Sequence, residues 1–217
     1  AAPGSPTLRA RKLACPQCHG SIKLQNPDAS LRVGCPYCGA LLDCEGDLKI
    51  LAKFGGKRIK PLLPLGTHAR FEGEKFVIIG YMRRAAVVDR TEYPFDEYLL
   101  HHPAKGYRWL VCADGHWSYV SPLDPGSVRG DLNPSALGAT FKHFSTALVA
   151  VKFVVGEFYW RVAVDDQVLA SDYIAPPYML SKEAVANEVT WSLGRYLTAD
   201  ELRTALAQPK LVLPRAD

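Results

Sequence analysis

Two Cys-x-x-Cys pairs near the start of the chain, Cys15 with Cys18 and Cys35 with Cys38, restrict the fold more than any other feature. Sixteen residues separate the two pairs. Zinc binds four thiolates in a tetrahedron, and one such turn supplies two of them on one side of the ion. A segment as short as residues 11–52 needs a centre of this kind, because it buries too little apolar surface to fold alone. We therefore predict a zinc ribbon over residues 11–52 that holds one structural zinc ion through these four cysteines and leaves no position for water.

Other chemistries of the cysteines fit the pattern less well. The first pair is followed by His19, which also matches the attachment pattern of c-type haem. Haem attachment needs export and leaves the second pair without a role, and a redox turn of the thioredoxin type needs only one pair. The two remaining cysteines, Cys44 and Cys112, lie outside the pattern. We expect Cys44 to be inert and Cys112 to belong to the core of a strand.

The basic residues are concentrated before residue 61. Residues 1–60 carry ten Lys and Arg against four Asp and Glu, a net +6, and residues 61–217 carry sixteen against eighteen, a net −2, which together give +4. Four zinc-bound thiolates would lower the ribbon's excess to +4. This charge favours an acidic protein partner. The candidate contacts lie in a basic linker over residues 53–64: Lys53, Lys57, Arg58 and Lys60. The composition of this segment fits a solvated linker without a partner better. Nucleic-acid binding through the ribbon is a weaker alternative, because dense Lys and Arg with exposed aromatics are missing.

The hydropathy pattern predicts no transmembrane segment. The longest apolar run, 147–155, is interrupted by Lys152 and is far shorter than the roughly 20 residues that a membrane span needs. The N-terminal stretch lacks the apolar centre of a signal peptide. We expect a cytoplasmic protein whose membrane association, where there is any, is peripheral and made through partners.

The residues after the linker predict a β-rich domain over 65–208. Strand patterns occupy 76–79, 92–100, 107–112, 116–120, 147–155, 157–164 and 168–174. Asp114-Gly115 marks a tight hairpin turn, and residues 121–139 have the composition of a long loop. The fold class is therefore mainly β, a β-rich α+β arrangement in which the zinc ribbon precedes a multi-stranded antiparallel domain.

Two short helices are expected at the end of this domain. Ser181 can cap a helix through Ser192, with Glu183 in its first turn. Thr198 and Glu201 form the capping box of a second helix. Flexible tails are expected at 1–10 and 209–217.

The segment GEFYWRV, residues 156–162, is the most unusual in composition. Strand alternation would place Glu157, Tyr159 and Arg161 on one face. Tyr and Arg are favoured in binding hot spots, so this face is a candidate recognition surface. The same pattern also fits a solvated face with a cross-strand ion pair.

No catalytic residue is assigned. His101 and His102 are neighbours on a predicted strand and would point to opposite faces, so the pair matches no metal motif. An enzyme remains an alternative if Glu157, Asp172 and one of the histidines meet in a cleft. The sequence contains no P-loop, Rossmann glycine pattern, nucleophile elbow or HExxH motif. These observations favour a binding or adaptor protein over an enzyme.

Several motifs in order resemble the bacterial domain of unknown function 4178 family over roughly residues 64–207. They are Leu65-Gly66, FVIIG at 76–80, DEYLL at 96–100, RWL at 108–110, GHW at 115–117, GEFYWRV at 156–162, DYIAPPYMLSKE at 172–183 and EVTWSLGRY at 188–196. The resemblance implies no activity and no catalytic residues, and an N-terminal zinc ribbon is a familiar attachment. Members are often encoded near polyamine-synthesis-like enzymes and membrane-stress proteins, which implies an accessory role in a membrane-associated or polyamine-linked stress system.

Overall fold

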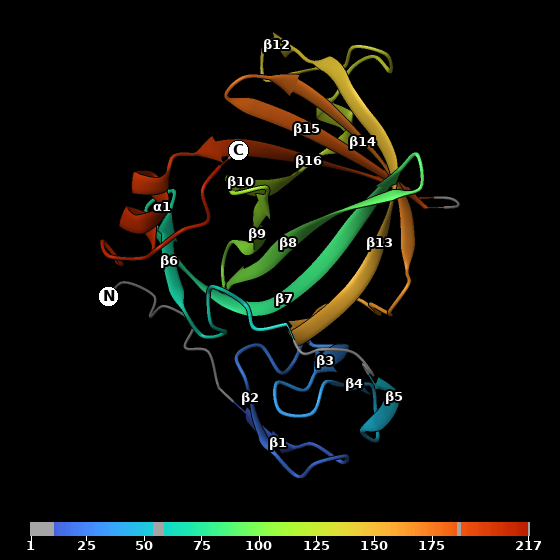
Figure 1. The fold of residues 1–217 in the computed structure, drawn as a ribbon, viewed down its shortest axis with the longest axis vertical. Helices are drawn as coiled ribbons and strands as arrows, with labels where there is room; N and C mark the ends of the chain where they lie inside the picture. Colours follow the sequence, from blue (N-terminus) through green and yellow to red (C-terminus); the bar gives the residue numbers. More distant parts are fainter. Residues whose placement is uncertain (1–10, 54–58, 186–187, 217) are drawn as a thin grey trace, which may run out of the picture. The chain divides into compact units, whose positions relative to one another are not determined.

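The computed structural model describes residues 11–53, 59–185 and 188–216 (Figure 1). Antiparallel strands make up most of this part of the chain, and its one α helix is α1, Ala199–Ala205. The strands of the N-terminal part are β1 Arg11–Ala14, β2 Ser21–Leu24, β3 Arg32–Gly34, β4 Ala40–Asp43, β5 Lys49–Lys53, β6 His68–Phe71, β7 Glu74–Val88 and β8 Thr91–His102. They are followed by β9 Gly106–Ala113, β10 His116–Leu123, β11 Ser135–Ala136, β12 Ala139–Thr140, β13 Lys142–Phe158, β14 Gln167–Ala175, β15 Tyr178–Val185 and β16 Glu188–Leu197. The predicted fold class is confirmed.

The chain divides into two compact units. The first contains the described residues of Ala1–Met82 together with Tyr98–Tyr107 and Phe153–Val164. The second contains the described residues of Arg83–Glu97, Arg108–Lys152 and Asp165–Asp217. Strands β7, β8, β9 and β13 contribute residues to both units. The predicted division at residues 53–64 stays a prediction, and the first compact unit extends well past that linker.

The first unit contains the segment predicted as a ribbon, which forms the five short strands β1 to β5. Strands β1 and β2 form a hairpin, and β3, β4 and β5 follow as an antiparallel meander. Their apolar residues pack around two of the cysteines in one buried cluster: Cys15, Ile22, Leu24, Val33, Cys35, Ala40 and Leu42. This cluster is small, as expected for a ribbon that relies on a metal as well as on apolar burial.

Two glycines let the ribbon pair closely with the long strand β13. Strand β3 runs antiparallel to the end of β13, with Gly34 opposite Gly156. A Cβ on Gly34 would lie 2.7 Å from the carbonyl oxygen of Val154, and Gly156 has a φ of +86°. Any larger residue at Gly34 would push the strands apart, and the left-handed backbone at Gly156 favours glycine. Backbone hydrogen bonds therefore join the ribbon to the rest of its unit.

The second unit is an antiparallel meander around strands β14, β15 and β16. Strand β13 pairs with β14, β14 with β15, β15 with β16, and β16 with β10. The Asp114-Gly115 turn joins β9 to β10, and Ala113 pairs with His116 on either side of it, which confirms the predicted hairpin. A buried cluster packs on the meander: Ala136, Phe141, Tyr173, Leu180 and Trp191. The expected loop over 121–139 is largely irregular, with a 3-10 turn, η1, at Pro125–Ser127 and the short strand β11.

The predicted helix over 181–192 is wrong. Its described residues, 181–185 and 188–192, belong to strands β15 and β16, which pair with Ser181 opposite Ser192. The hydroxyl of Ser181 donates to the carboxylate of Asp172 at 2.6 Å instead of capping a helix. Cross-strand pairing on both sides of β15 outweighs the local helix signal, which is a weak preference at any single position. The second predicted helix is confirmed as α1, with the capping box of Thr198 and Glu201 in place.

The predicted break between strands at Gly156 is also wrong. Strand β13 runs through this glycine without interruption and ends at Phe158. Residues 159–163 therefore leave the strand, although the sequence pattern predicted a separate strand over 157–164.

Candidate metal centre and its surroundings

The four cysteines of the two Cys-x-x-Cys pairs come together in the first unit. The sulfurs of Cys15, Cys18, Cys35 and Cys38 all lie within 4.8 Å of one another. The Cys15 and Cys38 sulfurs are 3.7 Å apart, and those of Cys18 and Cys35 are 3.8 Å apart. A tetrahedral zinc ion with bonds of about 2.3 Å separates its sulfurs by about 3.8 Å. The spacing therefore fits one tetrahedral ion, and four soft thiolates suit zinc.

Both turns have the same backbone construction. The amide of His19 donates to the carbonyl of Cys15 at 2.8 Å, and the amide of Gly39 donates to the carbonyl of Cys35 at 3.0 Å. His19 and Gly39 both have positive φ, +60° and +76°. Burial raises the pKa of the Cys35 thiol to about 12, and the peptide groups of Cys38 and Tyr37 oppose this rise, as those of Cys18 and Gln17 do at Cys15. Each turn thus aims two sulfurs at a common point by local hydrogen bonding, which explains why the sequence spacing was sufficient to find the site.

Glu157 joins the ribbon to strand β13 through its carboxylate. Its side chain is only 2% exposed. One carboxylate oxygen accepts the amide of Gln25 at 2.6 Å, and the other accepts the amide of Asn26 at 2.8 Å and the hydroxyl of Ser30 at 2.9 Å. Burial raises the pKa of Glu157, and these three donors oppose that rise. Glu157 therefore holds the 25–30 loop of the ribbon and presents no free carboxylate to a partner.

The other two members of the predicted recognition face lie beyond the end of β13. The ring of Tyr159 stacks on that of Tyr107, with centroids 3.9 Å apart and an interplanar angle of 18°. Arg161 forms a two-pronged ion pair with Glu45, and both contacts measure 2.8 Å. The strand alternation that grouped these residues with Glu157 stops at Phe158. The recognition role itself stays a prediction.

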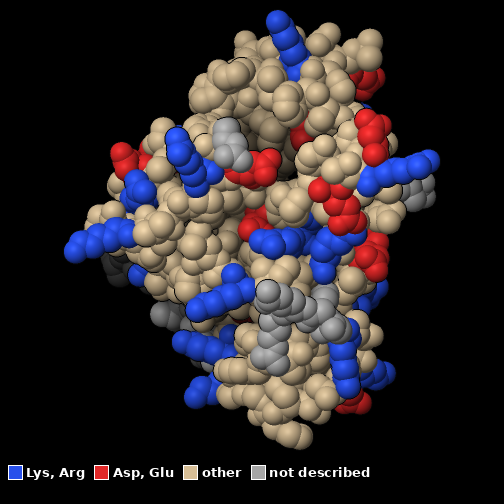
Figure 2. Space-filling model, in the orientation of Figure 1, with Lys and Arg blue, Asp and Glu red and all other residues tan. Residues whose placement is uncertain are grey.

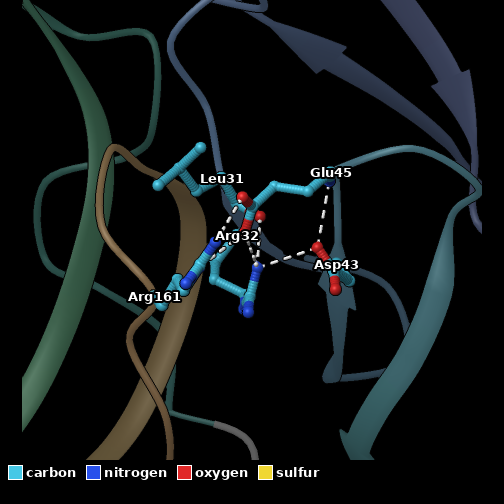
Figure 3. Close-up of polar contacts among 5 residues, drawn as sticks. All are labelled: Leu31, Arg32, Asp43, Glu45 and Arg161. Carbon is cyan, nitrogen blue, oxygen red and sulfur yellow. Dashed lines mark hydrogen bonds and ion pairs between the residues drawn. The ribbon is translucent and has the colours of Figure 1, made fainter.

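Glu45 is the centre of a charged network on the ribbon (Figure 3). Arg32 contacts Glu45 at 3.1 Å and Asp43 at 2.8 Å, and it also donates to the carbonyl of Leu31 at 2.9 Å. The hydrogen bonds from Arg161 lower the pKa of Glu45 to about 2. Because Arg161 follows β13 while Glu45 follows β4, this network is a second tie between the ribbon and the segment after β13.

The two neighbouring histidines have separate surroundings. His101 is buried, and its Nε2 lies 3.2 Å from the side-chain amide of Asn26, which also donates to the hydroxyl of Tyr107 at 2.8 Å. Nδ1 of His101 has no partner among the described residues, and burial lowers the pKa of His101, which favours the neutral ring. His102 lies 3.5 Å from Glu74 and accepts two backbone amides through Nδ1. The two rings therefore do not converge on one ion.

The remaining cysteines have the properties of inert thiols. Burial raises the pKa of Cys44 to about 11 and that of Cys112 to about 11. Both thiols stay protonated at neutral pH, and a protonated thiol is a poor nucleophile and a poor ligand.

The structure describes two of the four basic residues that were predicted to contact an acidic partner. Lys53 at the end of β5 and Lys60 are exposed, while Lys57 and Arg58 lie outside the described residues. In the view of Figure 2, Lys and Arg side chains lie at both sides of the region where Figure 1 places β1 to β5, and the surface between them is mostly uncharged.

Sequence reasoning missed a buried charged group in the second unit. Arg84 contacts Glu183 at 2.6 Å and Glu97 at 3.2 Å. On the same meander the carboxylate of Asp172 accepts the hydroxyl of Ser181, and Ser145 lies opposite Asp172 in register. Asp172 is thus held by residues of its own unit, as Glu157 is held by residues of the first. The polar residues of β14 and β15 do not alternate along the strands, so the sequence pattern gave no signal for this group, and the helix prediction over 181–192 misplaced Ser181 and Glu183.

Among the described residues, no helix is long and apolar enough to cross a membrane. The comparison with curated proteins gave no match, and the comparison with solved structures gave none either. The family model of the domain of unknown function DUF4178 matches residues 64–199, more than half of the 217-residue chain. The chain therefore belongs to the DUF4178 family.

Proposed function

We propose that this chain is a non-enzymatic binding or adaptor protein whose N-terminal ribbon is held by one structural zinc ion. The observation that carries the proposal is the tetrahedral spacing of four sulfurs that all belong to cysteines. Four protein ligands complete the coordination of zinc and leave no position for water or substrate. When bound, the ion would supply folding free energy to the ribbon, and the ribbon would supply a docking surface.

The basic side of the ribbon and linker is proposed to dock an acidic protein partner. Lys53 and Lys60 are exposed and able to meet carboxylates, and Lys57 and Arg58 complete the proposed set by sequence. The net positive charge of residues 1–60 supports a partner of negative charge. An accessory role in a bacterial membrane-associated or polyamine-linked stress system belongs to the same proposal and rests on the family's genomic setting. A cytoplasmic location is proposed with it from the hydropathy pattern of the sequence.

A second contact is proposed around Tyr159 and Arg161. The guanidinium side chain of Arg161 is 70% exposed although it pairs with Glu45. A partner carboxylate can therefore compete for it, and Tyr159 offers a ring that its stacking on Tyr107 already orients. Glu157 contributes to this surface indirectly, by holding the 25–30 loop.

Affinity capture from the native cell tests the adaptor proposal. The intact chain is compared with a variant carrying Lys53→Ala and Arg161→Ala, and with Lys49→Ala as a matched exposed control on β5. We expect the double variant to lose a partner that the control retains, and high salt to weaken that capture. Zinc content is measured in parallel and should be one ion per chain. Capture of the same partners by a variant with all four ribbon cysteines changed to serine would refute the proposed docking role.

A further inference from the structure

A cavity of about 550 Å³ lies in the first unit, beside the second cysteine turn. Its size falls in the range of small-molecule sites, roughly 300–1,000 Å³. Strand β7 contributes Ile78 and Ile79 to its wall, and β13 contributes Phe153 and Val155. All four of these side chains are buried. This part of the cavity wall is therefore apolar and is built on regular strands, while residues 59–66, which lie outside the strands, contribute another part.

The wall next to the metal centre comes from the turn itself. Pro36 and Tyr37, which lie between Cys35 and Cys38, line this side of the cavity. The hydroxyl of Tyr37 donates to the carbonyl of Ser21 at 2.9 Å, so its ring is held across the ribbon. The turn thus adds Pro36 and the held ring of Tyr37 to the lining of the cavity.

The charged groups available to a ligand in this cavity are cationic. Lys23 and Lys60 line it and are exposed, and neither forms an ion pair with any described residue. Glu157 also lines it, but both of its carboxylate oxygens already accept hydrogen bonds from the 25–30 loop. A ligand entering the cavity therefore meets apolar side chains, the buried and hydrogen-bonded carboxylate of Glu157, and two exposed ammonium groups that form no ion pair with a described residue.

We propose that this cavity binds a small amphipathic anion, with its apolar body against β7 and β13 and its carboxylate or phosphate head at Lys23 and Lys60. Lys60 belongs both to this site and to the proposed adaptor surface, but Lys23 belongs to the cavity alone. The capture experiment changes Lys53 and Arg161, neither of which lines the cavity, so either proposal can fail while the other stands. Charge complementarity selects an anion over a cation of the same apolar body.

Calorimetric titration of the full zinc-loaded chain tests the site with four probes of equal chain length: octanoate, octyl phosphate, octanol and octylamine. We expect the anions to bind about fivefold to tenfold more tightly than octanol, as two partly exposed ion pairs allow, and octylamine to bind most weakly. The tighter of the two anions identifies the head group that the site prefers.

Three variants give the test its controls. Lys23→Ala with Lys60→Ala should reduce anion affinity to that of octanol and leave octanol binding unchanged. Lys12→Ala with Lys49→Ala removes two exposed lysines that do not line the cavity and should change nothing. Leu65→Trp, on the half-buried part of the wall, should abolish binding of all four probes while circular dichroism shows an unchanged fold. Absence of anion binding at millimolar concentration, equal binding of octylamine, or an anion preference that survives loss of both lysines would each overturn the proposal.

Discussion

The two compact units satisfy their buried polar groups in different ways. In the first unit, Glu157 accepts backbone amides and a hydroxyl from the ribbon loop, and the ribbon itself is organised around four cysteine sulfurs. In the second unit, Arg84 is buried between Glu97 and Glu183, and strand pairing with apolar packing surrounds them. The first arrangement rests on a four-cysteine cluster that could hold a metal ion and on contacts between segments far apart in sequence. The second depends on the protein's own side chains alone, so the two units should respond differently to the same treatment.

Removal of the metal should produce the largest difference in stability between the two units. Structural zinc sites contribute on the order of 10 kcal/mol to folding, far more than the small ribbon core can replace. With the four cysteines changed to serine, we expect amide exchange in β1 to β5 to become fast and the protection of β13 near Gly156 to fall. Strands β14 to β16 should keep theirs.

Hydrogen exchange measured by mass spectrometry resolves these segments, and chelation of the wild type provides an independent route to the same state. Equal loss of protection in both units would show that the second unit also depends on the metal centre.

Breaking the buried ion group tests the second unit in turn. Arg84→Ala leaves Glu97 and Glu183 without their cation, and removing one partner of a buried pair costs about 3–5 kcal/mol. Arg83→Ala is the matched control, since the neighbouring pair of Arg83 and Asp96 is partly exposed and contributes at most about 1 kcal/mol. Urea unfolding of both variants gives the difference, and protection in β1 to β5 should be nearly unchanged. Similar losses for the two arginine variants would mean that burial does not distinguish the pairs.

The next largest effect on stability is expected from the contact between the ribbon and strand β13 in the first unit. Glu157→Ala leaves the amides of Gln25 and Asn26 without their acceptor, which costs about 1–3 kcal/mol for each unsatisfied group. We expect faster exchange in the 25–30 loop and in β3, with zinc still bound. Glu45→Gln is the comparison, because it weakens the exposed network with Arg161 without burying an unpaired group, and its effect on stability should be smaller. If the two substitutions destabilise equally, the buried carboxylate has no special role.

These contacts also mark the limit of what the sequence predicts. The cysteine turns, the Asp114-Gly115 hairpin and the Thr198 capping box are local arrangements, in which a few neighbouring residues determine the geometry, and all three were predicted correctly. The hairpin of β15 and β16 was mistaken for a helix because its decisive contacts are cross-strand pairs such as Ser181 with Ser192.

The role of Glu157 was also beyond local inference. Its partner Gln25 lies 132 positions away, and nothing in the GEFYWRV segment indicates that the strand ends at Phe158. Alternation therefore grouped a buried acceptor with two residues that have already left the strand. The cavity beside the cysteine turn could not be predicted for the same reason, because its walls come from segments around residues 22, 36, 78 and 155.

The smallest expected effect concerns the one described helix of the second unit, α1. The Thr198 hydroxyl accepts the amide of Glu201 at 3.2 Å, and the Glu201 carboxylate accepts the amide of Thr198 at 2.8 Å. Thr198→Ala should cost about 1 kcal/mol, the usual value for an N-cap.

The hydrogen bond from the Thr198 amide, with further bonds from Arg195 and the Thr198 hydroxyl, lowers the pKa of Glu201 from 4.5 to about 2. A lowered folded-state pKa stabilises the protein above the unfolded value and loses that effect as pH falls through the folded one. The destabilisation by Glu201→Gln, measured by thermal unfolding, should therefore be full above about pH 5 and shrink between pH 4.5 and 2, while a constant difference across this range would assign the effect of Glu201 to packing instead of charge.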